Sequence, residues 1–150
     1  KKMRAVLARV RSASVEIEGQ IHGRIEQGFL VLLGVHAEDT EKEAVKIADK
    51  ICGLRIFEDA DGKMNVNPID AGAANLLIIS QFTLFADCKS RRPGFSKAAR
   101  PETAIPLYEK VIELCREKGF TVATGEFGAE MLVSSVNDGP LTIILDTKEL

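Results

Sequence analysis

FLVLLGV, residues Phe29–Val35, is the stretch that decides the fold. It contains no charged residue and no proline, and such an uninterrupted apolar run is typical of a strand covered on both faces. A strand of this kind needs partner strands on both edges and packing on both faces. The sequence on either side of this strand indicates which segments supply the partner strands and which cover the faces.

Several of these segments have strand patterns. Arg4–Val10 and Ser14–Glu18 alternate apolar with polar residues, as half-buried strands do, and a hairpin is predicted through Gln20–Ile25. Asn75–Ser80 is predicted to be a second buried strand. The remaining predicted strands are Phe120–Ala123, Met131–Val136 and Leu141–Leu145.

Two segments have helical periodicity. Thr40, with Glu43 three positions later, is a capping-box signature, and the helix it begins is predicted to end at Gly53. Pro101–Lys118 is the second predicted helix, with Pro106 in its first turn because a proline deeper inside would remove a backbone hydrogen bond.

This order of elements predicts an α+β fold over one domain, residues 1–150. The sheet is expected to be mixed, largely antiparallel and barrel-like, with the two helices packed on one face. No GxGxxG or Walker A sequence occurs, which excludes those nucleotide-phosphate cradles.

Composition excludes further classes of protein. The formal net charge is −2, so any contact with nucleic acid must use a local basic patch. No apolar run approaches the ~20 residues of a membrane-spanning helix, and Lys1–Ala5 lacks the features of a secretory signal. No membrane partner is therefore expected.

The cysteines are few and widely spaced. Cys52, Cys88 and Cys115 are an odd number, so a disulfide framework is not expected. We therefore expect a reducing, cytoplasmic location. No His or Cys pair has metal-ligand spacing, so neither a metal nor a cofactor is expected. Cys88 precedes Lys89 and is either a reactive thiol or an ordinary loop residue.

The end of the Asn75–Ser80 strand carries the first candidate site, SQFTL, residues 80–84. Ser80, Gln81 and Thr83 lie where a sheet fixes the backbone and the next loop can line a pocket. If the strand continues, Gln81 and Thr83 share one face. The pattern leaves open whether these side chains are functional or only bond the backbone at a strand end.

The following segment, Cys88–Arg100, is rich in Lys and Arg and contains Phe95. Cations beside an aromatic ring suit phosphate contact and base stacking, although a charged run can also be a merely solvated surface. If the segment binds nucleic acid, the predicted contacts are Lys89, Arg91, Arg92 and Lys97.

NDGPLT, residues 137–142, lies between the last two predicted strands. Asp138 and Gly139 are a strong signal for a hairpin turn. Pro140 would then fall in the returning strand, where its missing N–H must face an edge or an opening. A Gly-Pro bond can adopt the cis form at low cost. From the pattern alone, a turn is favoured over a site.

The chain resembles the D-aminoacyl-tRNA deacylase family in three segments that occur in this order: SQFTL, Arg92-Pro93-Gly94-Phe95 and NDGPLT. That family is marked by SQxTL and NxGPxT motifs, which match here at every fixed position, and the resemblance extends from about Met3 to Thr147. It implies a metal-free, homodimeric esterase. Its substrate would be D-aminoacyl-tRNA, cleaved at the ester to the 3′-terminal adenosine.

The resemblance also implies the roles of individual residues. A cis Gly139-Pro140, here called the gate, would enter the partner subunit's active site, hold the substrate's α-amino group and exclude an L side chain. The pocket-lining residues would be Ser80, Gln81, Phe82 and Thr83. Further gate or substrate-binding residues would be Asn137, Thr142 and Phe95, with Arg9 supporting the gate.

Two accounts of the chemical step follow. Thr83 could be the nucleophile, or the ribose 2′-OH could assist while Gln81 and strand-end N–H groups stabilise the oxyanion. No general base is apparent in the sequence, which favours the second account. Two other functions stay open: a non-catalytic tRNA-binding module using residues 89–100, and a general esterase using Cys88 or Thr83.

Overall fold

The central strand is the predicted one. In the computed structural model, which describes residues 2–150, β3 (Gly28–Gly34) pairs antiparallel with β1 (Arg4–Ile17) and parallel with β6 (Asn75–Ser80). Phe29 and Val31 pack into one apolar cluster, whereas Leu30 packs into a second. The strand is therefore covered on both faces. Lys1, part of the stretch considered as a signal, lies outside the described residues.

The sheet is mixed and nearly closed. Its order is β2-β1-β3-β6-β7, where β2 is Gln20–Ile25 and β7 is Thr121–Thr124, and β8 (Leu132–Asp146) pairs with β1. The outer strands β2 and β7 curl toward each other. They come so close that a Cβ built at Gly23 of β2 would lie 3.0 Å from the Thr124 carbonyl oxygen of β7. The smaller apolar cluster fills the interior of this barrel-like sheet.

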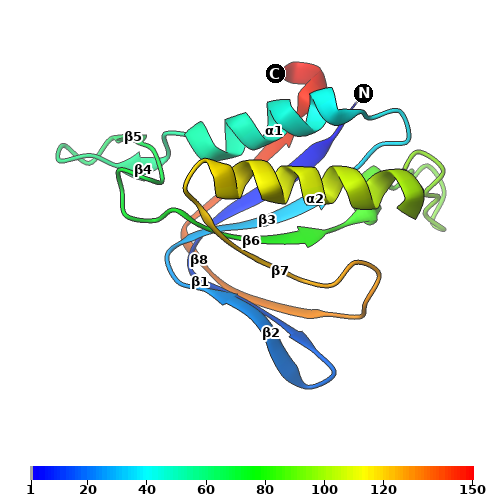
Figure 1. The fold of residues 1–150 in the computed structure, drawn as a ribbon, viewed down its shortest axis with the longest axis horizontal. Helices are drawn as coiled ribbons and strands as arrows, with labels where there is room; N and C mark the ends of the chain where they lie inside the picture. The colour runs from blue at the N-terminus through cyan, green and yellow to red at the C-terminus, as the bar shows by residue number, and fades with distance from the viewer. Residues whose placement is uncertain (1) are drawn as a thin grey trace.

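Both helices pack on one face of the sheet, over the larger apolar cluster (Figure 1). They are α1 (Glu41–Gly53) and α2 (Pro101–Glu117). The Tyr108 hydroxyl of α2 donates to the Ile78 carbonyl at 2.7 Å, and burial raises the pKa of Tyr108 to about 12, so the hydroxyl keeps its proton. This bond fixes α2 over β6, the strand that ends at Ser80.

The short elements lie at the periphery. β4 (Phe57–Glu58) and β5 (Met64–Val66) form a hairpin that projects at one end of the molecule (Figure 1). A 3-10 helix, η1 (Phe82–Phe85), follows β6, and a second, η2 (Thr147–Glu149), follows β8. Within residues 2–150, no helix is long and apolar enough to cross a membrane.

The predicted fold class is confirmed, and so is the capping box of α1. The Glu43 carboxylate accepts hydrogen bonds from the Thr40 N–H at 2.7 Å and from the Thr40 hydroxyl at 3.0 Å. The prediction for Pro106 is wrong, because α2 begins at Pro101 and Pro106 is its sixth residue, beyond the first turn. Pro106 is exposed, and it has no N–H to donate to the Glu102 carbonyl.

Two predicted strand breaks are also wrong. Arg4–Val10 and Ser14–Glu18 belong to one continuous strand, β1. Met131–Val136 and Leu141–Leu145 do not form a hairpin: from Leu132 on, both lie in β8, and both halves pair with β1. Since Ala8 pairs with Thr142 and Val10 with Asn137, Arg9 alone faces the four residues 138–141, which bulge out of the ladder.

Candidate active site

The segment Ser80–Thr83 begins where β6 ends. Ser80 pairs with Leu33 of β3, and the Gln81 N–H donates to the Leu33 carbonyl at 2.8 Å. The chain then turns into η1, so the predicted strand alternation through Thr83 is wrong. Gln81 and Thr83 nevertheless meet, because the turn lets the Gln81 Nε2 donate to the Thr83 Oγ1 at 2.5 Å.

A glycine on the neighbouring strand makes room for this turn. A Cβ built at Gly34 would lie 3.0 Å from the Gln81 carbonyl oxygen and 3.1 Å from the Phe85 ring. Distances this short leave no space for a side chain at position 34. The end of β3 therefore lies directly against η1.

Two exposed aromatic rings flank the turn. The Phe82 and Phe95 rings meet edge to face with centroids 5.1 Å apart, and the two residues are 53% and 37% exposed. Phe95 is held there because Asp87 and Gly94 exchange two backbone hydrogen bonds of 2.7 and 2.9 Å. The basic segment thus folds back and forms an aromatic platform with η1.

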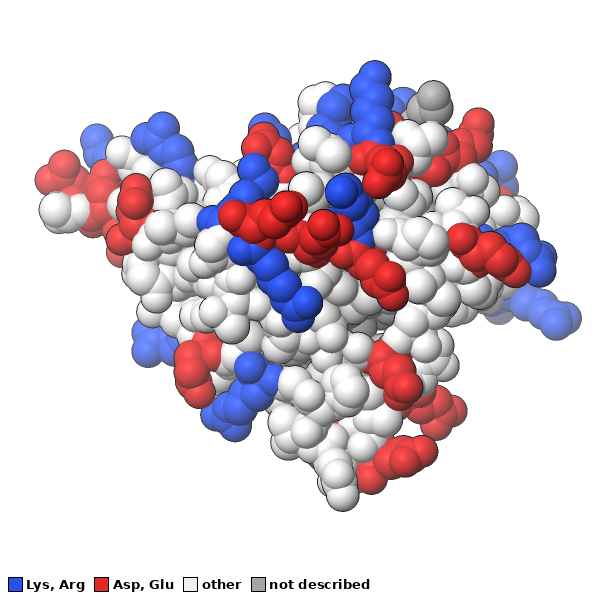
Figure 2. Space-filling view, viewed as in Figure 1, with Lys and Arg blue, Asp and Glu red and all other residues white. Residues whose placement is uncertain are grey.

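The cations of this segment lie on the surface. Lys89, Arg91, Arg92 and Lys97 are all exposed. At the end of the molecule that carries this loop, Lys and Arg lie beside Asp and Glu (Figure 2). Cys88 is exposed, and Cys52 and Cys115 are buried.

The gate lies in the bulge of β8, and its Gly139-Pro140 bond is cis, as predicted. The Asn137 Oδ1 accepts from the Leu141 N–H at 2.8 Å, and its Nδ2 donates to the Thr142 hydroxyl at 3.0 Å. Gly139 has φ +136°, and a Cβ there would lie 3.2 Å from the Arg9 guanidinium. Asn137, Gly139 and Thr142 therefore each shape the gate.

Arg9 supports the gate from beneath. The residue is 9% exposed, and its Nε donates to the Asp138 carbonyl at 3.0 Å while its Nη1 donates to the Ile56 carbonyl at 2.7 Å. Its guanidinium also lies 5.9 Å from the centroid of the Phe57 ring. One buried side chain thus joins the gate to the core.

The gate lies far from the Ser80–Thr83 turn in the same chain. Ser80 pairs with Leu33, Leu33 with Ala5, and Ala5 with Leu145, so these residues form one row across the sheet. Thr142 is three residues along β8 from that row, and the gate lies beyond it. At ~3.3 Å per residue and ~4.8 Å per strand, Ser80 and Thr142 are about 10 Å apart along the strands and about 14 Å across them.

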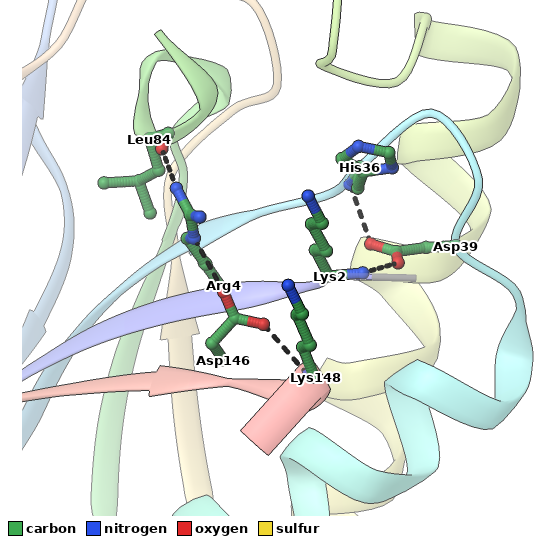
Figure 3. A network of polar contacts seen from close by, with 7 residues as sticks. All are labelled: Lys2, Arg4, His36, Asp39, Leu84, Asp146 and Lys148. Atoms are coloured by element: carbon green, nitrogen blue, oxygen red, sulfur yellow. Dashed lines mark hydrogen bonds and ion pairs between the residues drawn. The ribbon is translucent and has the colours of Figure 1, made fainter. Parts of the chain in front are cut away.

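A polar network that the sequence patterns did not reveal supports the other side of η1 (Figure 3). The Arg4 Nε donates to the Asp146 carboxylate at 2.9 Å, its Nη1 donates to the Leu84 carbonyl at 3.1 Å, and its guanidinium lies over the Phe85 ring. No local signal marks Arg4, because its partners are 80 and 142 positions away.

Burial and hydrogen bonding shift the pKa values of this network. Burial lowers the pKa of His36, whose Nδ1 accepts the Glu38 N–H at 3.1 Å. Burial raises the pKa of Asp39, although the N–H groups of His36 and Lys2 oppose the shift. Burial also opposes ionisation of Asp146, but hydrogen bonds from Arg4 and the Lys148 N–H outweigh it and lower the pKa.

Within residues 2–150, no group of three His, Cys, Asp or Glu residues is placed to hold a metal ion. Nor does any carboxylate or imidazole of this part of the chain bond the Thr83 hydroxyl, whose partner is the Gln81 amide. The turn therefore offers an amide donor, a hydroxyl and backbone N–H groups beside an aromatic platform.

Comparison with known proteins gives concordant matches. The sequence profile of the D-Tyr-tRNA(Tyr) deacylase family matches residues 6–146. The chain is 51% identical to the D-aminoacyl-tRNA deacylase of Thermosipho africanus over 99% of both chains. It is 53% identical to that of Thermus aquaticus, over 98% of this chain and 97% of the relative.

A solved structure is also similar. The c-Myc DNA Unwinding Element Binding Protein superimposes with a TM-score of 0.88 at 40% identity, over 95% of this chain and 97% of that one. The profile match contains the SQFTL turn, the aromatic platform, Arg9 and the gate.

Proposed function

Because the chain belongs to the D-Tyr-tRNA(Tyr) deacylase family, we propose that it hydrolyses the ester between a D-amino acid and the 3′-terminal adenosine of tRNA. It is an enzyme, a hydrolase that acts on carboxylic ester bonds. The observation that carries the proposal is the match over residues 6–146, which includes both motifs. We place this activity, proofreading for translation, in the cytoplasm.

The aromatic platform is the proposed seat of the terminal adenosine. Exposed rings such as those of Phe82 and Phe95 offer faces for base stacking. The loop that carries Phe95 also carries Lys89, Arg91, Arg92 and Lys97, which are available to tRNA phosphates. The ester would then lie over η1, beside Ser80, Gln81 and Thr83.

The gate of one subunit is proposed to complete the pocket of a second subunit. The ~10 Å and ~14 Å offsets prevent the gate from reaching its own turn. The most exposed apolar side chains of β8 lie on both sides of the gate: Leu132 at 68%, Val136 at 54% and Ile144 at 71%. A row of this kind is typical of a protein–protein interface, and a homodimer would cover it.

We propose that the main chain of the gate distinguishes D-aminoacyl from L-aminoacyl substrates. With the gate carbonyls holding the α-amino group and η1 holding the ester, the α-carbon has only one open direction for a side chain. A D residue would place its Cβ there, whereas an L residue would place it against Gly139 and Pro140. Such a gate rejects one enantiomer without selecting among D side chains.

The chemical step is proposed to use the substrate's own 2′-OH. Thr83 lacks a base partner, and an amide such as that of Gln81 cannot take its proton. The Gln81 amide and N–H groups of the turn are suited instead to stabilising the oxyanion.

Substitution of Thr83 tests this step. Thr83→Ala should change kcat by less than about tenfold, whereas a substrate with a 2′-deoxy terminal adenosine should react ~10²–10⁴-fold more slowly. Single-turnover rates of D-tyrosyl-tRNA measure both. A collapse of turnover in Thr83→Ala with full activity on the 2′-deoxy ester would restore Thr83 as the nucleophile.

A direct assay tests the proposed function itself. D-tyrosyl-tRNA and L-tyrosyl-tRNA are incubated with the protein, and the remaining ester is measured. Rapid loss of the D ester alone is expected. Equal loss of both would refute the chiral gate, and binding without loss of either would indicate the non-catalytic tRNA-binding module. Inactivation by thiol alkylation would indicate an esterase that uses Cys88.

A further inference from the structure

A small basic pocket lies directly behind the active-site turn. It has a volume of about 230 Å³, and its walls come from the start of β1, the end of β3, the residues after η1 and the end of the basic loop. This volume is below the ~300–1,000 Å³ of pockets that take whole drug-sized ligands. The pocket therefore fits a single small group.

The charges of the pocket favour an anion. Lys2, Arg4, Lys89 and Lys97 line it, with Asp87 as the one carboxylate among its lining residues. Within residues 2–150, no carboxylate lies at ion-pair distance from the ammonium groups of the three lysines. Four cations thus line the pocket beside one carboxylate, and the three lysines among them make no ion pair within the described residues.

Arg4 is held in place, but not all of its hydrogen-bond donors are used. Its Nε and Nη1 bond Asp146 and the Leu84 carbonyl, which leaves donors of the guanidinium fork unused. The Lys2 side chain extends beside it toward His36 (Figure 3). The Lys97 backbone is fixed as well, because its carbonyl accepts the Ala37 N–H at 2.9 Å.

The pocket is adjacent to the proposed site of chemistry. Phe85 forms part of its wall and ends the 3-10 helix that contains Thr83. Two residues of chain span at most ~7.6 Å between Cα atoms. A nucleotide strand whose last base stacks on Phe82 and Phe95 would therefore carry its preceding phosphates past this pocket.

We propose that this pocket binds a backbone phosphate of the single-stranded 3′ end of the substrate RNA. This inference rests on the proposed function. One phosphate would be bound by Lys2, Arg4, Lys89 and Lys97. Arg91 and Arg92 would remain available for other contacts with the RNA. The pocket would fix how far the strand advances, so that the ester comes to rest over η1.

Two small substrates test the pocket separately from the catalytic turn. One is the D-tyrosyl ester of adenosine, which has no phosphate, and the other is the D-tyrosyl ester of a three-nucleotide RNA ending in adenosine. Lys97→Gln and Lys89→Gln should each lower kcat/KM roughly tenfold on the trinucleotide ester and leave the adenosine ester unchanged. The salt dependence on the trinucleotide ester should weaken by about 0.7 per lost contact.

Lys63→Gln is the matched control, because it removes one exposed lysine from the β4–β5 hairpin at the opposite end of the molecule (Figure 1). It should leave both substrates unaffected. Equal losses on both esters in Lys97→Gln, or no loss on the trinucleotide ester, would overturn the phosphate site.

Binding without catalysis separates this inference from the proposed function. The trinucleotide RNA without an amino acid should bind roughly tenfold more weakly to Lys97→Gln than to the unmodified protein. That result would support the pocket even if neither ester were cleaved, an outcome that refutes the deacylase function alone. Inorganic phosphate that binds as tightly as the trinucleotide would overturn the assignment to RNA.

Discussion

Arg9 shows how much one residue of a strand can organise. It is the only β1 residue opposite the four-residue bulge, and its guanidinium reaches the Asp138 carbonyl on one side and the Ile56 carbonyl on the other. A planar fork holds its donors in fixed, separated directions and so reaches both carbonyls, whereas an ammonium group offers its donors from a single atom. The position of the gate therefore depends on Arg9 more than on its other neighbours.

Replacement of Arg9 should affect stability and selectivity together. Arg9→Leu leaves two carbonyls without their donors and should lower the unfolding free energy by about 2–4 kcal/mol, measured by urea denaturation. Arg9→Lys should recover only part of this loss. Hydrolysis of L-tyrosyl-tRNA should rise in both variants relative to that of D-tyrosyl-tRNA, because the gate is no longer fixed.

Arg11 provides the control. It lies two residues away and its Nε is 3.7 Å from the Asp138 carboxylate, but its side chain is 76% exposed. Arg11→Leu should cost no more than about 1 kcal/mol and leave selectivity intact. Similar losses in Arg9→Leu and Arg11→Leu would contradict the special role of Arg9.

At the scale of elements, α2 carries a local defect. Pro106 cannot donate to the Glu102 carbonyl, yet it lies in the second turn because the buried residues on either side of it, Ala104 and Leu107, hold the helix on the sheet. Packing here outweighs backbone preference. Pro106 is exposed, so removing its ring would cost little packing.

Pro106→Ala should therefore stabilise the protein. A helix-interior proline costs ~3 kcal/mol, and its restriction of the unfolded chain returns ~0.4–1 kcal/mol, which leaves a net gain of about 2–2.6 kcal/mol. Thermal and urea unfolding measure it. Pro101→Ala is the comparison, because proline suits the first position of a helix and its loss should not stabilise. A destabilised Pro106→Ala would show that the ring is needed for packing.

Elements set by local sequence could be predicted, whereas those set by distant partners could not. The apolar run of β3 and the Thr40–Glu43 pair identify their elements within a few residues. The continuity of β8 through Pro140 depends on β1, more than a hundred residues away, and the alternation through Thr83 is lost because η1 packs on Gly34. The same reason applies to the site: motifs marked Gln81 and Gly139, but not Arg4.

At the scale of the whole molecule, the exposed row on β8 is the proposed interface of a homodimer. Ile144→Glu places a charge in the proposed interface and should give a monomer in light scattering, with an unchanged circular dichroism spectrum. D-tyrosyl-tRNA hydrolysis should fall at least ~100-fold, because the pocket loses its gate. Val45→Glu on α1, where the residue is 50% exposed, is the control and should remain dimeric. A fully active monomer would contradict the shared site.

The unfolding free energy should depend on pH because burial lowers the pKa of His36. The pKa of His36 is lowered from 6.5 in the folded protein, mainly by burial, so the unfolded chain binds a proton near pH 6.5 when the folded chain does not. The unfolding free energy should therefore fall as the pH drops through 6.5 toward the folded pKa, by at most ~1.4 kcal/mol per pH unit.

Measurement from about pH 7.5 to 5.5 identifies His36 by the sign of the change, because the raised pKa of Asp39 would make the unfolding free energy rise as the pH drops. Glu38, Asp39 and Lys2 face His36 and remain in place in both proteins compared. His36→Asn retains an acceptor for the Glu38 N–H and should show a flatter profile over this range. An equally steep profile in His36→Asn would assign the effect to another group.

The offset of three strands between Ser80 and Thr142 has a consequence for mixtures of damaged copies. If two subunits share each site as proposed, a chain with a defective turn and a chain with a defective gate should each be inactive as homodimers. When they associate at random, half of the dimers are mixed, and each mixed dimer holds one intact turn facing one intact gate. About a quarter of all sites should then work. Two inactive alleles of this protein would complement each other in one cell.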